Sequence, residues 1–144
     1  MKSENASDVF PIESDPHEGK PFIYLACPYT PVGNTESNVK EYRFEIVTRI
    51  TADFIKRGNL IYSPITYTHP IAKVNSYIHH EEYLNLDLFF LKRADILMVA
   101  CLPGWEDSQG VKKEIQIAKD LGKGIIYLDT YLYEEEMRAL GKKK

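Results

Sequence analysis

The sequence predicts an α/β fold of the flavodoxin-like, doubly wound type: one domain in three layers, with a mostly parallel sheet of four or five strands between helices. Short apolar runs alternate along the chain with longer segments in which apolar residues recur at every third or fourth position. The short runs are apolar throughout, as strands are when helices cover both faces of their sheet. A chain of 144 residues has the length of a single domain.

Four segments are expected to form the strands. They are residues 22–27, 59–62, 96–101 and 124–128. Pro28 ends the first strand and Ser63–Pro64 ends the second, because proline cannot donate a hydrogen bond to a neighbouring strand. Helical segments follow the strands in regular alternation, which predicts that the strands run parallel.

Helices are expected over residues 34–58, 81–93, 111–121 and 134–140. Asn34 or Thr35 can cap the first helix, and Gly58 and Gly122 stand where the glycine that follows a helix belongs. One buried stripe is expected along the first helix, formed by Val39, Tyr42, Ile46, Ile50 and Phe54.

The remaining segments are expected to lack regular structure. A long loop through His69–Pro70 and Asn75 is expected between the second strand and the second helix. Residues 1–20, rich in Ser, Asp, Glu, Pro and Lys, are predicted to be a flexible tail, and residues 142–144 a frayed end. The domain is therefore expected to span residues 21–141.

Composition argues against several classes of function. A net charge of −3 is unlike that of a non-specific nucleic-acid or membrane-surface binder. No segment approaches the roughly 20 apolar residues of a membrane span, and residues 1–20 lack the apolar core of a secretory signal, so a cytoplasmic protein is expected. Cys27 and Cys101 lie in apolar runs and are expected to be buried thiols. Their spacing fits neither a disulfide framework nor a zinc site, and no metal or other cofactor is expected.

The loop after the third strand is the first candidate site, because ligands of parallel sheets bind at the carboxyl ends of the strands. It contains Ser108, Gly110 and Val111 and leads into a helix that carries Glu114, expected in the first turn. The start of this helix would direct backbone N–H groups and the positive end of the helix dipole at a ligand. Alternatively, Ser108 only caps the helix and Glu114 only complements its dipole.

Three further residues are expected near this loop or in the core. Tyr24 and Thr30 flank the end of the first strand and so share its rim; Tyr24 could donate a hydrogen bond to a carboxylate or belong to the core. Asp87 lies in an apolar helical stretch, where an isolated charge is costly unless it is paired or functional. The alternative is that Asp87 lies on an exposed helix face.

Three motifs occur in order at these strand ends. They are Tyr24-Leu-Ala-Cys-Pro-Tyr29, the segment from Asp87 to Asp95, and Ser108-x-Gly110-Val-x-x-Glu114. Together they resemble the nucleoside 2-deoxyribosyltransferases and their relatives, the 2′-deoxynucleoside 5′-monophosphate N-glycosidases and the cytidylate N-glycosidases. The segment Leu-Pro-Gly-Trp-x-x-Ser-x-Gly is similar to a small branch of that superfamily. The resemblance spans residues 22–128.

The resemblance implies an enzyme that cleaves or transfers an N-glycosidic bond. Glu114 would be the carboxylate that meets C1′ of the sugar, Asp87 the acid that protonates the departing base, and Tyr24 the residue that orients Glu114. A carboxylate in this place would stabilise or trap the oxocarbenium character that develops on the sugar. The apolar setting of Asp87 would raise the pKa of its carboxyl group.

Ser108 separates two subfamilies. Transferases that act on free nucleosides carry Asp at this position, whereas relatives that act on nucleoside monophosphates carry Ser. A hydroxyl group and helix-start N–H groups accept a phosphate that a carboxylate would repel. The resemblance therefore implies a small nucleotide, a 5′-monophosphate, as ligand, and no polymeric nucleic acid or membrane as partner.

Other residues are candidates for ligand contact or assembly. Trp105 could stack on a base or plug its own loop, and His69 lies after the second strand, at the expected cleft edge. Members of the family complete each site with a neighbouring subunit, which implies a homodimer or homotetramer. The helix around Tyr83, Phe89 and Phe90 is expected to supply an apolar interface.

Two other functions stay open. A phosphoribohydrolase of the lysine-decarboxylase-like type also places a Glu on a helix after a strand, but Pro103-Gly104-Trp105 does not match its Pro-Gly-Gly motif. A module that binds nucleotides without turnover would be indicated by an exposed, unpaired Asp87. A pair between Glu114 and Lys112 or Lys113 away from the cleft would indicate the same; both lysines are expected to face solvent.

Overall fold

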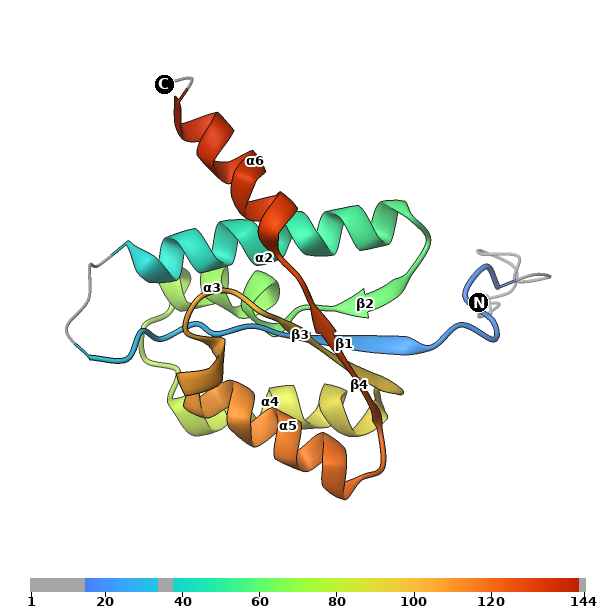
Figure 1. Ribbon diagram of the computed structural model, residues 1–144. Helices are drawn as coiled ribbons and strands as arrows, with labels where there is room; N and C mark the ends of the chain where they lie inside the picture. The colour runs from blue at the N-terminus through green and yellow to red at the C-terminus, as the bar shows by residue number, and fades with distance from the viewer. Residues whose placement is uncertain (1–14, 34–37, 143–144) are drawn as a thin grey trace, which may run out of the picture.

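The computed structural model, which describes residues 15–33 and 38–142, contains a sheet of four parallel strands (Figure 1). The strands are β1 (Phe22–Ala26), β2 (Leu60–Tyr62), β3 (Ile96–Ala100) and β4 (Gly124–Leu128). Their order is β2-β1-β3-β4, and every neighbouring pair runs parallel. The expected flavodoxin-like fold is confirmed, with the apolar run of β3 in the interior of the sheet.

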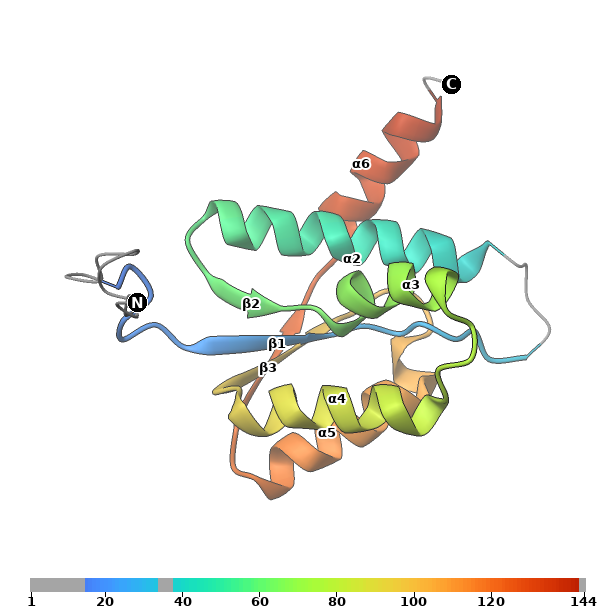
Figure 2. The ribbon, with the colours of Figure 1, turned by 180° about the vertical axis from the view of Figure 1, so that it is seen from behind.

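Helices cover both faces of the sheet (Figures 1 and 2). On one side lie α2 (Val39–Lys56) and α3 (Pro64–Val74), with α6 (Tyr131–Lys142) packed against α2 and leading away from the body. On the other side lie α4 (His80–Arg93) and α5 (Gln109–Asp120). Connections from β1 and β3 leave to opposite faces, so the switch in strand order falls between these two strands.

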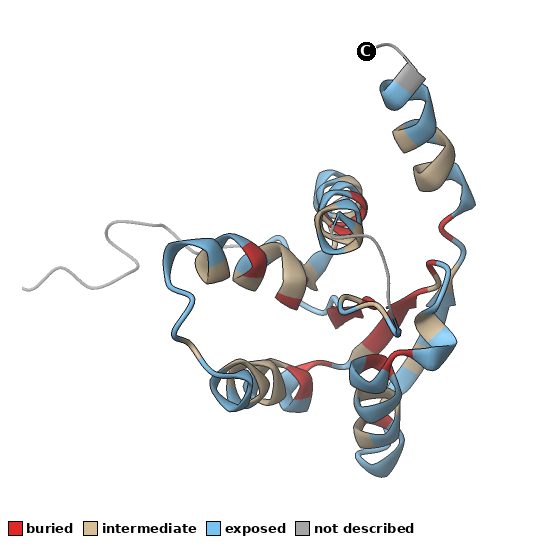
Figure 3. Ribbon diagram, turned by 90° about the vertical axis from the view of Figure 1, so that its left-hand side faces the viewer, coloured by how far each residue is buried: buried red, intermediate tan, exposed pale blue. Residues whose placement is uncertain are grey.

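Successive residues of the central strands contribute to two cores, one on each face of the sheet. Ile23 and Leu25 pack with Ile46 and Ile50 of α2, whereas Tyr24 packs with the α4–α5 layer. Figure 3 shows the buried residues concentrated where the helices meet the sheet. The edge strand β4 is more exposed than its apolar sequence suggested, since no helix covers its outer residues fully.

The expected ends of the helices are largely correct. Gly58 and Gly122 follow α2 and α5 with φ angles of 89° and 69°, a left-handed conformation that glycine adopts without strain. The expected caps Asn34 and Thr35 lie outside the described residues, and α2 has Asn38 as its N-cap. In the expected stripe of α2, Ile46 and Ile50 are buried, but Tyr42 is exposed.

The long loop expected after β2 is wrong, because its first half is helix α3. Ser63 caps this helix by accepting a hydrogen bond from the N–H of Thr66 (3.3 Å), and Pro64 occupies its first position, where proline costs nothing. Pro70 lies inside the helix. The sequence pattern did not predict a helix here because an interior proline removes a backbone hydrogen bond. His69 is therefore held on a helix rather than on a loop.

Helix α5 begins at Gln109, two residues before the expected start. Glu114 consequently lies in the second turn, beyond the reach at which the helix dipole stabilises a carboxylate most strongly. The expectation that Glu114 lies in the first turn is corrected.

The chain ends also differ in detail. Residues 15–20 form a turn, and Nζ of Lys20 donates to the carbonyl oxygen of Gly58 (2.8 Å); residues 1–14 of the expected tail lie outside the described part. Helix α6 ends at Lys142, and residues 143–144 of the expected frayed end lie outside the described part. Cys27 is buried as expected, but Cys101 is only half-buried. Within the described residues, no helix combines the length and apolar character needed to cross a bilayer.

Candidate active site

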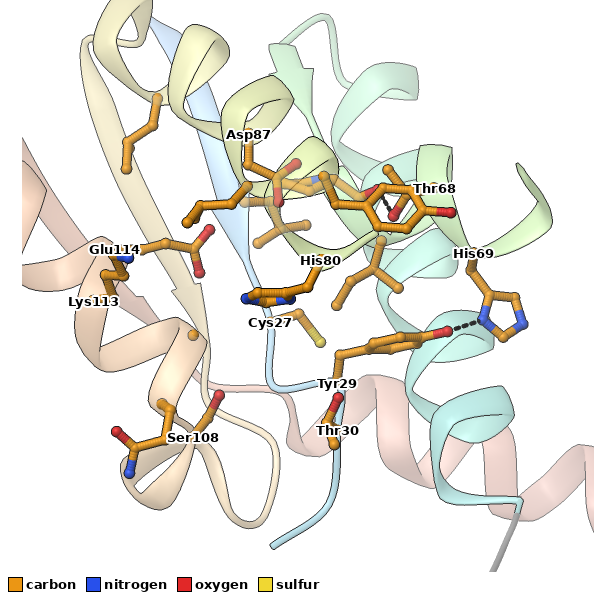
Figure 4. A pocket seen from close by; sticks show the side chains of 18 of the residues that line it. Cys27, Tyr29, Thr30, Thr68, His69, His80, Asp87, Ser108, Lys113 and Glu114 are labelled. Carbon is orange, nitrogen blue, oxygen red and sulfur yellow. Dashed lines mark hydrogen bonds between the residues drawn. The ribbon is translucent and has the colours of Figure 1, made fainter. Parts of the chain in front are cut away.

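A cleft of about 700 Å³ opens at the carboxyl ends of β1 and β3, a size suited to a nucleotide-sized ligand (Figure 4). Its walls come from the segment after β1, from α3, from α4 and from the start of α5. The cleft thus lies where the strand-end rule predicts a ligand site, at the switch in strand order. The end of β4, which was also a candidate, does not line this cleft.

Tyr24 and Glu114 form a short hydrogen bond in the cleft. The Tyr24 hydroxyl donates to Oε2 of Glu114 at 2.5 Å, joining β1 to the second turn of α5. Tyr24 is fully buried at its strand position, so its hydroxyl is held rigidly. Burial and the neighbouring Glu114 raise the pKa of Tyr24, which keeps the phenol protonated as a donor. The contact that the sequence predicted is present.

Asp87 faces Glu114 across the cleft from α4 (Figure 4). Its Oδ1 atom is buried and has no hydrogen-bond partner in the described part of the protein. An exposed, unpaired Asp87 was the sign of a module without turnover, and this carboxyl group is instead partly buried inside the cleft. A buried polar atom without a partner is costly, so its place at the cleft wall suits it to meet a ligand.

Both carboxyl groups hold protons more tightly than usual. Burial raises the pKa of Glu114 to about 8, against the opposing effect of the hydrogen bond from Tyr24 and with a contribution from the charge of Asp87. Burial likewise raises the pKa of Asp87 to about 6. At a pH between these values the two facing carboxyl groups together hold one proton, an arrangement suited to acid–base chemistry.

The start of α5 provides anion-binding groups at another part of the cleft wall. Ser108 and Gly110 line the cleft, and the Ser108 side chain accepts a hydrogen bond from the N–H of Val111 (3.3 Å). The N–H groups of Gln109 and Gly110 have no acceptor within the helix. Lys113 is exposed, as expected, and also lines the cleft.

Two expected ligand contacts are not brought into the cleft. Trp105 packs against Tyr127 of β4, with ring centroids 5.4 Å apart, and does not line the cleft. This position agrees with the structural alternative, in which Trp105 fills space within its own loop, rather than with stacking on a base. Val111 is buried in the core beside the α4–α5 layer. Thr30 lines the cleft as expected, while Asp95 accepts a hydrogen bond from the N–H of Phe22 (2.7 Å) at the opposite end of the sheet.

Residues 21–130 match the model of a family described as a domain of unknown function, DUF1937. The chain belongs to this family. No curated protein sequence matches it.

The fold of this DUF1937 protein is that of a solved nucleoside-processing enzyme. The 2-deoxyribosyltransferase of the psychrotolerant bacterium Bacillus psychrosaccharolyticus superposes with a TM-score of 0.52 at 23% sequence identity. The match covers 73% of this chain and 69% of that enzyme, which is described as a biocatalyst for the synthesis of antiviral and antitumoral nucleosides. At this identity the similarity shows a common fold.

Sequence reasoning missed part of the cleft wall of the DUF1937 protein. Tyr29 and Tyr83 both line the cleft, although Tyr83 was expected at an interface. Phe90 also faces inward and stacks on Tyr62 at 4.0 Å, so Phe89 alone of the three aromatic residues expected at the interface is exposed. The four-residue step from Tyr83 to Asp87, one helical turn, was the signal that both share a face.

Metal-binding side chains do not gather in the described residues. No group of three or more His, Cys, Asp or Glu side chains has a geometry that could hold an ion there. Of the two carboxyl groups in the cleft, Glu114 accepts a hydrogen bond from Tyr24, and Asp87 faces the open space of the cleft.

Proposed function

We propose that this DUF1937 protein cleaves or transfers the N-glycosidic bond of a nucleoside 5′-monophosphate, with Glu114 as the nucleophile. The observation that carries the proposal is the Tyr24–Glu114 hydrogen bond of 2.5 Å inside a cleft that Asp87 faces. A rigid tyrosine fixes one carboxyl oxygen and leaves the other free to meet a sugar carbon. The shared fold with a 2-deoxyribosyltransferase supports the same chemistry.

The reaction proceeds through a glycosyl ester. One oxygen of Glu114 attacks C1′, the C1′–N bond breaks with its electron pair moving to the base, and the base takes a proton from Asp87. Water or a second base then attacks C1′ and gives its proton to Asp87, while the ester bond breaks and returns the Glu114 carboxylate.

Proton location decides when the cleft is reactive. The reaction needs Glu114 ionised and Asp87 protonated, whereas burial holds the proton more tightly on Glu114 in the empty cleft, where the pKa values are about 8 and about 6. Positive charge that develops at C1′ favours an ionised Glu114. We infer that the proton moves to Asp87 as the substrate approaches the transition state.

The 5′-phosphate is proposed to bind at the start of α5. Ser108 and Gly110 provide a hydroxyl group and a free backbone N–H, and Lys113 adds a positive charge on the same helix. Glu106 and Asp107, the acidic residues of the preceding loop, do not line the cleft and so do not oppose a phosphate there. A free nucleoside would leave these groups without a partner.

The two alternatives have less support. A nucleotide sensor was expected to pair Glu114 with a lysine outside the cleft, but no such ion pair forms among the described residues, and Glu114 binds Tyr24 inside it. A phosphoribohydrolase of the lysine-decarboxylase-like type would need a glycine-rich phosphate loop, and half-buried Trp105 occupies that part of the chain.

The test is a panel of ribo- and 2′-deoxyribonucleoside 5′-monophosphates, assayed by chromatography for free base. We expect release of base from at least one monophosphate and none with the Glu114→Ala variant, whose nucleotide binding by calorimetry and thermal unfolding stay close to wild type. Full activity of Glu114→Ala would refute the role of Glu114. Release of base from nucleosides but not from monophosphates would refute the phosphate assignment.

We also propose that the protein assembles as a homodimer or homotetramer. Exposed apolar side chains on β4 and α6 support an interface there rather than around the inward-facing Tyr83 and Phe90. They are Ile126, Tyr127, Tyr131, Leu132 and Leu140. Light scattering at micromolar concentration tests this: we expect a dimer or larger, and Leu132→Glu should dissociate it, whereas a wild-type monomer contradicts the proposal.

A further inference from the structure

A chain of three side chains connects the cleft to its outer wall on α2. The hydroxyl group of Tyr29 lies 2.5 Å from Nδ1 of His69, and Nε2 of the same ring lies 2.8 Å from Oε2 of Glu41 (Figure 4 shows the Tyr29–His69 contact). Tyr29 follows β1, His69 lies on α3 and Glu41 on α2, so three separate elements hold the chain. The proposed reaction uses none of these residues.

The partners of His69 fix the direction of its hydrogen bonds. The pKa of Glu41 is lowered by its hydrogen bonds with Lys73 and His69, so this carboxylate only accepts and Nε2 of His69 carries the hydrogen. The His69 ring is 7% exposed and stacks on Phe44 at 4.2 Å, and Lys73 already contacts the same Glu41 oxygen at 3.0 Å. We consider the neutral form of the ring, the common form of histidine above about pH 6.5.

A neutral imidazole with hydrogen on Nε2 has a lone pair on Nδ1. Tyr29 therefore donates its only hydroxyl proton to His69, and the remaining lone pair of its oxygen is available to a ligand in the cleft. Burial, together with Glu41 and Tyr83, raises the pKa of Tyr29 and keeps the phenol protonated. Two cations also lie beside Tyr29: Lys40, whose Nζ is 5.2 Å from the centre of the ring, and Arg43, whose Nη1 donates to the Tyr29 backbone carbonyl oxygen at 3.2 Å. Tyr29 thus presents an acceptor rather than a donor.

Tyr29 lines the same cleft as Tyr83 and Asp87. Tyr83 is one helical turn from Asp87, the proposed acid for the departing base, so we infer that the base lies within reach of Tyr29. The Tyr83 hydroxyl group and Oδ1 of Asp87 are both buried without a partner among the described residues. Polar atoms in this state gain most from a ligand that carries matching donors and acceptors.

We propose that Tyr29 recognises the exocyclic group of the leaving base as a hydrogen-bond acceptor, so that the protein prefers amino bases, adenine or cytosine, to their oxo counterparts, hypoxanthine or uracil. The proposal rests on the proposed function. His69 and Glu41 are positioning residues that set the direction of the Tyr29 proton. A carbonyl group in place of the amino group would set two acceptors against each other, an arrangement that sites built on hydrogen bonding reject strongly.

The experiment compares matched pairs of 5′-monophosphates: adenosine with inosine, and cytidine with uridine, each in ribo and 2′-deoxy form. For the pair that is cleaved, we expect kcat/KM to favour the amino base by about tenfold or more. Tyr29→Phe should bring this ratio close to one by lowering the value for the amino base. Tyr67→Phe, which removes an exposed hydroxyl group from α3 outside the cleft, should leave the ratio unchanged.

Two variants of His69 separate positioning from structural damage. His69→Leu frees the Tyr29 proton to turn toward the ligand, so the amino preference should vanish although Tyr29 is present. His69→Asn places an acceptor near the former Nδ1 and should restore most of the preference, with thermal unfolding as the check on folding. Unchanged ratios in Tyr29→Phe or His69→Leu, or a wild-type preference for the oxo base, would overturn the proposal.

A binding measurement distinguishes failure of this inference from failure of the proposed reaction. Calorimetry with the Glu114→Gln variant gives Kd values for adenosine, inosine, cytidine and uridine monophosphates without turnover. If no base is released from any nucleotide but the amino preference persists in Kd, the reaction assignment fails and the recognition by Tyr29 stands. Equal Kd values within both pairs, or no binding at all, refute the recognition.

Discussion

The hydroxyl group of Tyr24 and the Oε2 atom of Glu114 lie 2.5 Å apart although 90 positions separate them in the chain. The contact joins a central strand to the helix that follows the next strand of the sheet, across the point where the strand order switches. Because the Tyr24 phenol is buried and stays protonated, it acts as a fixed donor to the carboxyl group.

Removing the Tyr24 hydroxyl group should slow catalysis more than it weakens binding. The hydrogen bond from Tyr24 lowers the pKa of Glu114, so Tyr24→Phe leaves the nucleophile protonated over a wider pH range. We expect kcat to fall by about 10- to 100-fold, with KM changed less than threefold, since removing one such donor costs a few kcal/mol at most. Steady-state kinetics on the cleaved monophosphate measures this, and a rise in KM at constant kcat would contradict it.

The pH dependence of cleavage should be bell-shaped. Below about pH 6 both carboxyl groups are protonated and no nucleophile is available; above about pH 8 both are ionised and no acid is available for the base. The optimum for kcat/KM should therefore lie near pH 7. Asp87→Asn should remove the alkaline limb while lowering the plateau. A rate that rises steadily to pH 10 would argue against a shared proton.

Glu114→Gln should stabilise the protein in a pH-dependent way. The pKa of Glu114 is about 8 in the folded protein and near 4.5 in an unfolded chain, so the wild-type protein loses stability as pH rises from about 4.5 to 8, while only the unfolded state ionises. The gain from the substitution should be close to zero at pH 4.5, grow by about 1.4 kcal/mol for each pH unit between these values, and level off at roughly 5 kcal/mol above pH 8. Chemical denaturation across this range measures it, with the exposed Glu106→Gln as a flat control.

Substitutions at the start of α5 should weaken the binding of monophosphates more than that of nucleosides. Ser108→Asp sets a negative charge against a 5′-phosphate, and Lys113→Ala removes a positive one, so KM for the monophosphate should rise about tenfold or more in the first variant and severalfold in the second. Activity on the matching nucleoside should fall less. Lys112→Ala, one residue earlier but outside the cleft, is the matched control. Equal losses on nucleoside and monophosphate would disprove a phosphate site here.

Gly104 should be intolerant of a side chain. Its φ angle is 91°, and an added Cβ would lie 3.0 Å from Nη2 of Arg43, which donates to the Pro103 carbonyl oxygen at 3.1 Å. Gly104→Ala should cost about 1–2 kcal/mol and weaken monophosphate binding, because the loop that leads to Ser108 shifts. Gly122→Ala, with φ 69° and no atom near the added Cβ, should cost about 1 kcal/mol without affecting binding. Equal effects on binding would show that the Arg43 contact does not hold the loop.

Local sequence patterns were informative where local physics decides the structure. The strands β1 and β3 are apolar on both faces because helices bury both, and this is visible in six consecutive residues. Gly58 and Gly122 marked the helix ends because a left-handed residue there is almost free for glycine alone. Helix α3 was missed because Pro70 argues locally against a helix, while packing of Ile65 and His69 against the body compensates for the lost hydrogen bond.

The sequence by itself determined the parallel α/β fold and the cleft at the ends of β1 and β3, because residue periodicity and the strand-end rule are local or topological. The meeting of Tyr24 with Glu114 was implied only by the family resemblance. Tertiary structure alone decided that Trp105 packs on Tyr127, that Lys113 lines the cleft, and that Glu114 is governed by burial rather than by the helix dipole. It also created the chain from Tyr29 through His69 to Glu41. Such contacts depend on where three separate elements bring their side chains together, and no pattern along one segment specifies that arrangement.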